Sequence, residues 1–480
     1  MSWQELAIAS ARWVDHAVLV YFLALNSHLL VLMILGFRAT YRATAMSHDR
    51  DLLSLLQSPL MPPVSVIVPA HNESINIIES VLSVLQLRYP VFEVVVVNDG
   101  SSDDTLAILL ERFKMRRTER GFDSHIPCKP ILAVYESAEF PNLVAVDKRN
   151  GGKGDAQNAG INVSRYPLFC TIDGDSLLEE DALLRVARPF HDYPGQIVAT
   201  GGTIRIANGS LVRAGRITDA RLAHALLPRI QAVEYLRAFL FGRMGWSSFG
   251  GLLLISGAFG IFDKQVVVEA GGYATDSVGE DMELVIRVHR VLRDRGRSYR
   301  IGFVPEPVCW TEAPESLRVL GRQRERWQRG LIDTLLRHRS MMLRPRYGAV
   351  GMLAMPAFFL FEMLAPVIEL AGLVLVPASW ALGILDSAFM FAFLSASILY
   401  AIVVSVTAVL LDDLVFRRYS GVRQLLSLVS AGIVEATVLR PLSTLWRARG
   451  CWNYLRGVTS WGKMERKGLV SPAQSAQRQA

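Results

Sequence analysis

The chain has 480 residues, of which 51% are hydrophobic and 20% charged, and its formal net charge is +7 at pH 7. This length is too great for one ordinary soluble domain, and the apolar content is typical of a membrane protein. The charge does not indicate nucleic-acid binding, because membrane proteins gather Lys and Arg on their cytoplasmic side. The four cysteines form no CxxC motif, so we expect reduced thiols rather than a metal centre.

The first apolar segment, residues 17–37, carries no charge and is about long enough to span a bilayer. Arg38, Arg42 and Arg50 follow it, which predicts that its C-terminal side is cytoplasmic. A cleaved signal peptide is less favoured, because acidic residues precede the segment and no small-residue cleavage site follows it. We therefore assign residues 1–45 to a transmembrane helix and its juxtamembrane segment.

Residues 62–330 are more charged and predict an α/β domain. Four short runs, mostly apolar, are typical of strands buried on both faces of a parallel sheet: residues 64–70, 91–99, 142–147 and 168–173. Residues 74–85, between the first two runs, predict a helix. This order gives a βαβ unit with the usual right-handed crossover.

Polar side chains follow three of these strands. The first strand leads to Glu73, the second ends at Asp99, and the fourth leads to Asp173 and Asp175, separated by a glycine. Ligands of open α/β sheets bind at the carboxyl ends of strands. Mg²⁺ or Mn²⁺ would explain the acidic pair, because Mg²⁺ commonly binds one or two carboxylates together with substrate phosphates. The alternative is that Asp175 or Ser176 only caps a following helix.

The loop "KRNGGKGDAQNAG" (148–160) combines glycines with Lys153 at the start of a predicted helix. Backbone N–H groups and a lysine in such a loop can hold an anion. The loop is not a Walker A motif, because Asp147 stands where that motif has its first glycine and Gly154 follows the lysine. The first strand is not followed by GxGxxG either. Both observations disfavour mononucleotide hydrolysis and dinucleotide redox chemistry.

Two further stretches allow a functional and a structural interpretation. Glu280 and Asp281 open a predicted amphipathic helix at 278–292, where acidic residues either stabilise the helix N-terminus or supply a general base. The stretch "GRQRERWQRG" (321–330) is rich in arginine and contains Trp327. It is either a basic helix at a membrane surface or a phosphate-gripping helix whose tryptophan stacks on a sugar.

The rest of the chain is divided into an amphipathic interface segment, a membrane block and a basic cytoplasmic tail: residues 331–348, 349–446 and 447–480. The membrane block contains three apolar stretches: residues 349–382, 387–411 and 425–445. Prolines interrupt the first stretch, and the third contains Glu435, Arg440 and Pro441. If the tail is cytoplasmic, the third stretch is not a simple crossing. We therefore expect two full spans plus a broken or re-entrant segment.

Glu362 and Glu369 lie seven residues apart within the first apolar stretch and share one helical face. Carboxylates inside a membrane are costly and usually face a wet cavity or a charged partner. These two glutamates either line a polar path through the membrane block or pair with Arg440 and cap the breaks at the prolines.

Seven motifs in order resemble those of the family-two inverting glycosyltransferases of GT-A fold: "SVIVPAHNE", "VVVNDGSSDDT", "NGGKGDAQNAG", "DGD", "SGAFGIF", "GED" and "QRERW". More narrowly, the set resembles the membrane-embedded processive synthases of poly-N-acetylglucosamine, hyaluronan, chitin oligosaccharides and cellulose. The resemblance covers residues 62–330 and the arrangement of the apolar membrane segments on both sides of them. It implies an α/β GT-A domain with a Rossmann-like mixed sheet, facing the cytoplasm and embedded in an α-helical transmembrane protein.

The resemblance implies roles for individual residues. Contacts to a UDP-sugar fall to Glu73, Asp99, Lys153 and Asp173, and the divalent metal, Mg²⁺ or Mn²⁺, falls to Asp175. The base that deprotonates the acceptor corresponds to Asp281, and the motif that closes over diphosphate and acceptor corresponds to Gln323, Arg326 and Trp327. "SGAFGIF" (256–262) corresponds to the loop that lines the acceptor, and Gly279 stands where many relatives have threonine.

The expected activity is extension of a polysaccharide from a UDP-sugar, coupled to export across the inner (plasma) membrane. N-acetylglucosamine is the first expectation for the donor sugar. The expected partners are the UDP-sugar, the growing glycan, the lipid bilayer and regulatory or export proteins, but no nucleic acid. Two alternatives stay open: transfer of one sugar to a lipid acceptor, and a non-catalytic membrane receptor or scaffold that keeps the nucleotide-binding fold.

Overall fold

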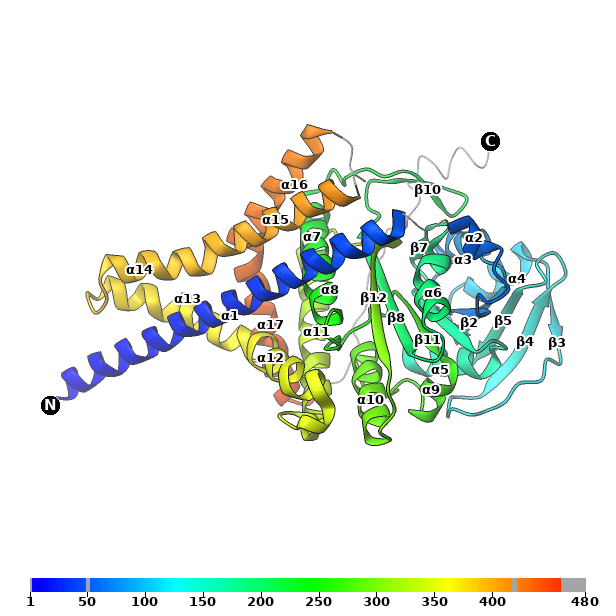
Figure 1. Cartoon of the computed structure of the whole chain (residues 1–480), viewed down its shortest axis with the longest axis horizontal. Helices are drawn as coiled ribbons and strands as arrows, with labels where there is room; N and C mark the ends of the chain where they lie inside the picture. Colours follow the sequence, from blue (N-terminus) through cyan, green and yellow to red (C-terminus); the bar gives the residue numbers. More distant parts are fainter. Residues whose placement is uncertain (1, 49–51, 417–420, 459–480) are drawn as a thin grey trace.

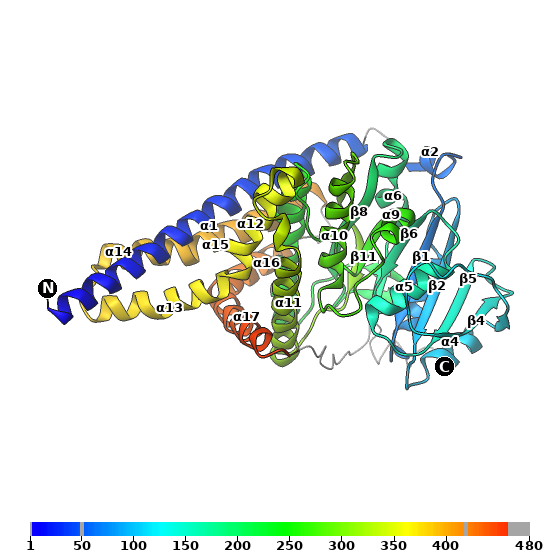
Figure 2. The same ribbon diagram turned by 90° about the horizontal axis from the view of Figure 1, so that it is seen from below.

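The computed structural model describes residues 2–48, 52–416 and 421–458. Two parts lie side by side in Figures 1 and 2: a large β-sheet with covering helices, and a group of long helices that includes the N-terminal helix α1 (Trp3–His48). Arg50 and residues 459–480 of the expected basic tail lie outside the described residues.

The four predicted strands are confirmed and form the parallel centre of the sheet. They are β1 (Val64–Ala70), β2 (Phe92–Asp99), β5 (Leu143–Lys148) and β6 (Leu168–Ile172). β1 pairs in parallel with β2 and β6, and β2 pairs in parallel with β5. Their valines, leucines and isoleucines are almost wholly buried, as expected for strands covered on both faces. The carboxyl ends of all four strands therefore meet at one edge of the sheet.

The complete sheet has ten strands in the order β3-β4-β5-β2-β1-β6-β11-β8-β12-β7. The additional strands are β3 (Met115–Thr118), β4 (Ile131–Ser137), β7 (Ser176–Leu178), β8 (Ile197–Ile206), β11 (Phe259–Asp263) and β12 (Arg300–Thr311). β11 runs antiparallel to β6 and β8, whereas β12 runs parallel to β8 and antiparallel to β7. The sheet is therefore mixed, as predicted. A separate hairpin consists of β9 (Leu211–Arg213) and β10 (Arg216–Asp219).

Helices cover the sheet and connect it to the long helices (Figure 1). They are α2 (Leu52–Leu56), α3 (Ile77–Leu85), α4 (Thr105–Arg112), α5 (Lys153–Val163), α6 (Ala182–Asp192), α7 (Leu226–Leu236), α8 (Met244–Ser247), α9 (Lys264–Glu269), α10 (Glu280–Asp294) and α11 (Leu317–Arg337). A π-helical turn, η1 (Arg237–Arg243), joins α7 to α8. Short 3₁₀ turns follow α11 at Arg339–Met341 and Pro345–Tyr347.

The structure excludes the capping alternative for the acidic pair. Ser176–Leu178 form strand β7, which pairs with β12, and the next helix begins only at Ala182 after Asp181. Asp175 therefore stands between two strands of the same sheet rather than at the start of a helix.

Three helices within the described residues are long and apolar enough to cross a membrane: Trp3–Ala45, Ser387–Val415 and Val422–Leu455. A fourth candidate is the bent pair Val350–Met363 and Ala365–Ala381, which meet at 41°. After residue 349, each of these candidate spans consists of several shorter helices. They are η4 (Val350–Ala354), α12 (Met355–Phe358), η5 (Phe359–Met363), α13 (Ala365–Ala381), α14 (Ser387–Leu394), η6 (Ser395–Leu399), α15 (Tyr400–Val415), α16 (Val422–Val434), η7 (Glu435–Leu439) and α17 (Arg440–Leu455).

The bend lies in the first apolar stretch, next to Pro366, whereas the third stretch forms one continuous helix through Pro441. The π-helical turn η7 ends two residues before Pro441, and local π-helical geometry can re-satisfy the backbone groups that a proline leaves open. How these segments cross a membrane stays a prediction.

The continuous helix also runs past the expected start of the tail and packs closely on α11. A Cβ atom on Gly450 would lie 2.8 Å from the carbonyl oxygen of Glu325, and one on Gly321 would lie 2.9 Å from the indole of Trp446. Glycine at both positions therefore allows the two helices to approach this closely.

Glu362 and Glu369 are both paired. The Glu369 carboxylate lies 3.5 Å from the Arg440 guanidinium and accepts a 2.9 Å hydrogen bond from the Thr444 hydroxyl. Glu362 pairs with Arg447 at 3.0 Å. For Glu369 this is the predicted pairing with Arg440. A role of either side chain in a polar path stays a prediction.

Candidate functional site

The loops after β1 and β2 are held together at the carboxyl edge of the sheet. Asn72 has a positive φ of 57°, and its side-chain oxygen accepts a 2.8 Å hydrogen bond from the Ser102 backbone N–H. Glu73 follows and is buried. A Cβ atom on Gly174 would lie 3.3 Å from Cγ of Glu73, so this side chain packs against the acidic turn that follows β6.

Asp99 positions the glycine-rich loop. Its carboxylate accepts hydrogen bonds from the backbone N–H groups of Gly151 (3.0 Å) and Gly152 (2.8 Å). It also pairs at 2.5 Å with the ammonium group of Lys148, which is fully buried and lies 2.6 Å from Asp155. Asp99 therefore acts structurally on the loop, and its predicted contact with a nucleotide stays a prediction.

The Asp99–Lys148–Asp155 cluster was not predicted from the sequence. One signal was available, because Lys148 ends an apolar strand and is the direct cross-strand neighbour of Asp99. A buried lysine requires a carboxylate partner, and adjacent strand ends supply one here.

Lys153, at the first position of α5, joins three segments of the site. Its ammonium group lies 2.5 Å from Asp173, 3.8 Å from Glu280 and 3.5 Å from the carbonyl oxygen of Gly257. Burial opposes the lysine charge, but the carboxylates of Asp173 and Glu280 outweigh it and raise the pKa of Lys153 above its ordinary value. The loop lysine is therefore a firmly charged group between the acidic turn and α10.

Asp175 is a buried carboxylate with acidic neighbours. Burial raises its pKa to about 7, and the negative charges of Asp173 and Glu312 add to this shift. A divalent cation would relieve the repulsion, so the side chains fit a metal at this position. Within the described ranges, no group of three or more His, Cys, Asp or Glu residues could hold a metal ion. A cation at Asp175 would therefore need oxygens from substrate phosphates or water, as Mg²⁺ commonly does.

The expected general base opens α10 and contacts the "SGAFGIF" segment. Asp281 accepts a 3.1 Å hydrogen bond from the backbone N–H of Gly257. Its neighbour Glu280 is buried, and this burial, together with the charge of Asp281, raises the pKa of Glu280. Residue chemistry alone did not distinguish the two acids, and the family resemblance assigned the base to Asp281. In the structure Glu280 faces Lys153, whereas Asp281 is held by the segment that was expected to line the acceptor.

The α11 motif supplies a cation to the same acidic cluster. Burial lowers the pKa of the Arg326 guanidinium, and the nearby charges of Glu280, Asp281 and Asp173 act against this shift. Gln323 is buried, whereas Trp327 is 41% exposed, with the Arg324 guanidinium 4.4 Å above its ring. Arg324 is itself fixed by an ion pair of 2.7 Å with Glu234 on α7.

The structure thus brings together five sequence-predicted residues from three helices and the turn after β6: Lys153, Asp173, Asp175, Asp281 and Arg326. We call this charged cluster the candidate cleft. Glu73 borders it at Gly174, and Asp99 holds the neighbouring glycine loop. Glu312, which the sequence analysis did not assign, belongs to the candidate cleft as well. Gly257 and Glu280 join it from the "SGAFGIF" segment and the start of α10, which the sequence analysis had singled out. Such an arrangement of carboxylates, lysine and arginine can hold a metal–diphosphate and accept a proton.

Parts of the chain match known protein families. Residues 168–411 match the family model "Glycosyl transferase family group 2", and residues 65–126 match "Glycosyl transferase family 2". The chain is 28% identical over 289 residues to the poly-beta-1,6-N-acetyl-D-glucosamine synthase of Staphylococcus epidermidis, covering 60% of this chain and 59% of that protein. It is 29% identical over 275 residues to the synthase of the same name from Staphylococcus aureus, covering 57% and 56%.

A solved structure shares the fold. The mannosyltransferase PcManGT from Pyrobaculum calidifontis, in complex with GDP-Man and Mn²⁺, matches with a TM-score of 0.50 and 17% identity over 88% of this chain and 99% of that chain. The family match spans half of the sequence and includes the acidic turn, the α10 carboxylates and the α11 motif. The chain belongs to glycosyl transferase family group 2.

Proposed function

We propose that the chain is a membrane-bound inverting glycosyltransferase that uses a UDP-sugar and a divalent metal to extend a polysaccharide. The observation that carries the proposal is the convergence of Lys153, Asp173, Asp175, Asp281 and Arg326 on one cleft. An unreactive scaffold has no need for the buried carboxylate of Asp175 among acidic neighbours, and perturbed charges of this kind cluster at functional sites.

In the proposed reaction, a hydroxyl of the acceptor attacks the anomeric carbon of the donor from the side opposite the diphosphate. Asp281 takes the hydroxyl proton as the new C–O bond forms, and the hydrogen bond from Gly257 orients its carboxylate. The bond from the anomeric carbon to the diphosphate oxygen breaks, and UDP leaves with the electron pair. This single displacement inverts the configuration.

The leaving diphosphate gains negative charge, and the cations around the cleft stabilise it. Arg326 and Lys153 supply fixed positive charge. Asp175 would hold Mg²⁺ or Mn²⁺, which supplies Lewis-acid stabilisation of the diphosphate when bound. Trp327 is exposed enough to stack against the acceptor sugar, and Gln323 lies one turn before it on the same helix.

The polymer-forming activity is supported by the two staphylococcal relatives, which are named as poly-beta-1,6-N-acetyl-D-glucosamine synthases. The alignments cover less than two thirds of either relative, so the donor UDP-N-acetylglucosamine and the product are part of this proposal. The candidate membrane helices support a multi-pass protein of the inner (plasma) membrane. The catalytic domain would face the cytoplasm, and the glycan would be exported beside the helices.

The test is UDP release by the purified full chain in detergent, with Mn²⁺ or Mg²⁺ and a panel of UDP-sugars, followed by sizing of the product. We expect release with one sugar, a long glycan product and a loss on the order of 10²–10³ in rate for Asp281→Asn. A single-sugar glycolipid as the sole product would replace the polymerase assignment by lipid glycosylation. Absence of UDP release with every sugar and metal would favour a receptor or scaffold.

A further inference from the structure

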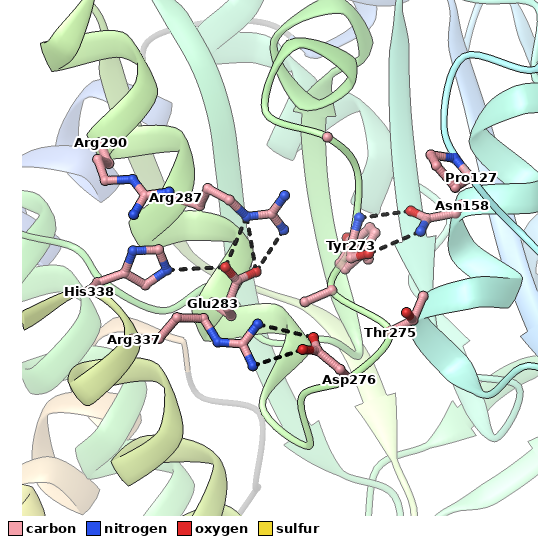
Figure 3. A pocket seen from close by; sticks show the side chains of 12 residues that line it. Pro127, Asn158, Tyr273, Thr275, Asp276, Glu283, Arg287, Arg290, Arg337 and His338 are labelled. Atoms are coloured by element: carbon pink, nitrogen blue, oxygen red, sulfur yellow. Dashed lines mark hydrogen bonds and ion pairs between the residues drawn. The ribbon is translucent and has the colours of Figure 1, made fainter.

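A pocket of about 390 Å³ lies apart from the candidate cleft (Figure 3). None of the cleft residues named above lines it. Its walls come from the middle of α5, the loop 271–276, the body of α10 and the end of α11. In Figure 3, Arg287, Arg290 and His338 stand on one side of the pocket, and Asn158, Tyr273 and Thr275 stand on the other.

Part of the lining is a fixed ionic framework. Arg287 binds Glu283 through hydrogen bonds of 2.6–3.2 Å and also donates to the carbonyl oxygens of Ala270 and Gly272. His338 contacts the other side of the same carboxylate, with Nε2 at 3.1 Å from it. Burial would raise the pKa of Glu283, but these hydrogen bonds outweigh it and lower the value to about 2. Glu283 is therefore a permanent anion that holds two cationic or hydrogen-bonding groups in place.

Other groups of the lining are not used by this framework. The Arg290 side chain forms no hydrogen bond or ion pair with any residue that the structure describes. The ring nitrogen Nδ1 of His338 is buried and likewise has no hydrogen-bond partner within the described parts of the chain, and the residue is only 1% exposed. Arg337 binds Asp276 at 3.0 and 3.2 Å. The lining has three arginines against two carboxylates, so it carries excess positive charge.

We propose that this pocket binds a small phosphate-bearing anion. Its volume falls within the range of small-molecule sites. The guanidinium group of Arg290 presents the planar N–H fork that matches phosphate oxygens. A phosphate oxygen beside His338 would accept a hydrogen bond from Nδ1, the ring nitrogen without a partner among the described residues, while Nε2 keeps its contact with Glu283. Thr275 and Asp276 are exposed at the rim, so the ligand can enter from solvent.

The position of the pocket gives the ligand a means to act on the cleft. Each of its three helices carries a cleft residue elsewhere: Lys153 on α5, Asp281 on α10 and Arg326 on α11. The loop is also connected to the acidic turn, because Tyr273 is hydrogen-bonded to Asn158 of α5 and lies 3.3 Å from the Thr171 hydroxyl of β6. An anion bound between Arg290 of α10 and His338 at the end of α11 would link these two helices and hold them together.

The test uses the full chain in detergent, saturated with UDP so that phosphate sites in the cleft are occupied. Inorganic phosphate, AMP and adenosine are titrated separately by calorimetry at constant ionic strength. We expect saturable binding of phosphate or AMP and none of adenosine. Arg290→Ala should weaken that binding at least tenfold, roughly the loss of one charge-assisted hydrogen bond. AMP binding tighter than phosphate binding would assign a phosphate ester as the ligand.

Two further variants make the result decisive. Thr275→Trp places a large side chain in the pocket from an exposed loop position, so it should abolish binding without disturbing the core. Arg116→Ala removes an exposed arginine on β3 and should bind as the wild type does. The proposal is overturned if phosphate and AMP do not bind, if adenosine binds as well as AMP, or if Arg290→Ala and Thr275→Trp both keep wild-type affinity.

Discussion

At the scale of single residues, the buried carboxylate of Asp175 should lower the stability of the metal-free protein at neutral pH. Its pKa of about 7 in the folded chain lies above the ordinary value of about 3.9 expected for the unfolded chain. The folded state therefore binds more protons between these two values, and the metal-free protein should lose stability as the pH rises from about 4 to 7. Asp175→Asn removes the buried charge. We expect the metal-free variant to have a higher unfolding temperature than the wild type at pH 8, and a smaller advantage at pH 5.

The same substitution should lower the rate of UDP release by a factor on the order of 10²–10³. With UDP present, Mn²⁺ should raise the unfolding temperature of the wild type, because a ligand that binds only the native state stabilises that state. Asp175→Asn lacks the proposed metal ligand, so Mn²⁺ should not raise its unfolding temperature. Equal stabilisation of both proteins by Mn²⁺ would remove Asp175 from the metal site.

The two lysines near the glycine loop, Lys148 and Lys153, should have different roles, one in the stability of the fold and one in catalysis. Lys148→Met leaves Asp99 and Asp155 buried without their shared cation, which typically costs about 3–5 kcal/mol. Lys153→Met changes a partly exposed lysine at the cleft, so it should slow UDP release while causing a smaller loss of stability. Denaturant unfolding and UDP release measured on both variants check this prediction. A larger stability loss for Lys153→Met would reverse the assigned roles.

At the scale of elements, the start of α10 and the middle of α11 come into close backbone contact at two glycines, Gly279 and Gly330. A Cβ atom on Gly330 would lie 3.0 Å from the backbone N and Cα of Gly279. Gly330→Ala should therefore push the start of α10, with Asp281, away from Arg326. We expect a stability loss of about 1–3 kcal/mol, as for other overpacked sites, and a marked fall in UDP release.

Gly242→Ala is the matched control for this helix contact. It lies in the π-helical turn η1, and a Cβ atom there meets nothing within 4 Å. Its unfolding free energy and turnover should stay close to those of the wild type. The close approach of α10 and α11 has no role in catalysis if Gly330→Ala retains wild-type turnover.

The sequence was informative where structure is local. Apolar runs such as 64–70 predicted the parallel strands, and the polar residues after them predicted the cleft edge. The strands β8 and β12 were missed, because they pair with each other from positions about a hundred residues apart. β7 was missed because Ser176–Leu178 is short and follows two aspartates, a pattern that also fits a capped helix. Residue chemistry alone did not separate Glu280 from Asp281, because their different surroundings depend on Lys153 and Gly257; only the family resemblance assigned the base to Asp281.

At the scale of the whole molecule, buried ion pairs join the catalytic sheet to the long helices. Arg205 of β8 is hydrogen-bonded to Asp412 of α15, with 3.2 Å between Nη1 and Oδ2, and both side chains are almost fully buried. Arg237 of η1 binds Glu435 of η7 at 2.9 and 3.1 Å, and the Ser405 hydroxyl of α15 donates to the same carboxylate. The sheet is thus anchored to α15 directly and, through η1, to the helix that contains η7.

A double-substitution experiment tests this anchoring. Arg205→Met leaves Asp412 buried without its counter-ion, so the free energy of unfolding should fall by about 3–5 kcal/mol, whereas replacing both partners by apolar side chains is often nearly neutral. We therefore expect Arg205→Met with Asp412→Leu to recover most of the stability in detergent-based unfolding, and to recover UDP release with it, because the apolar pair still packs β8 against α15. If stability returned without turnover, the ionic contact itself would be required for catalysis. If neither returned, the loss would not come from an unpaired Asp412, since the double variant has no such charge left to bury.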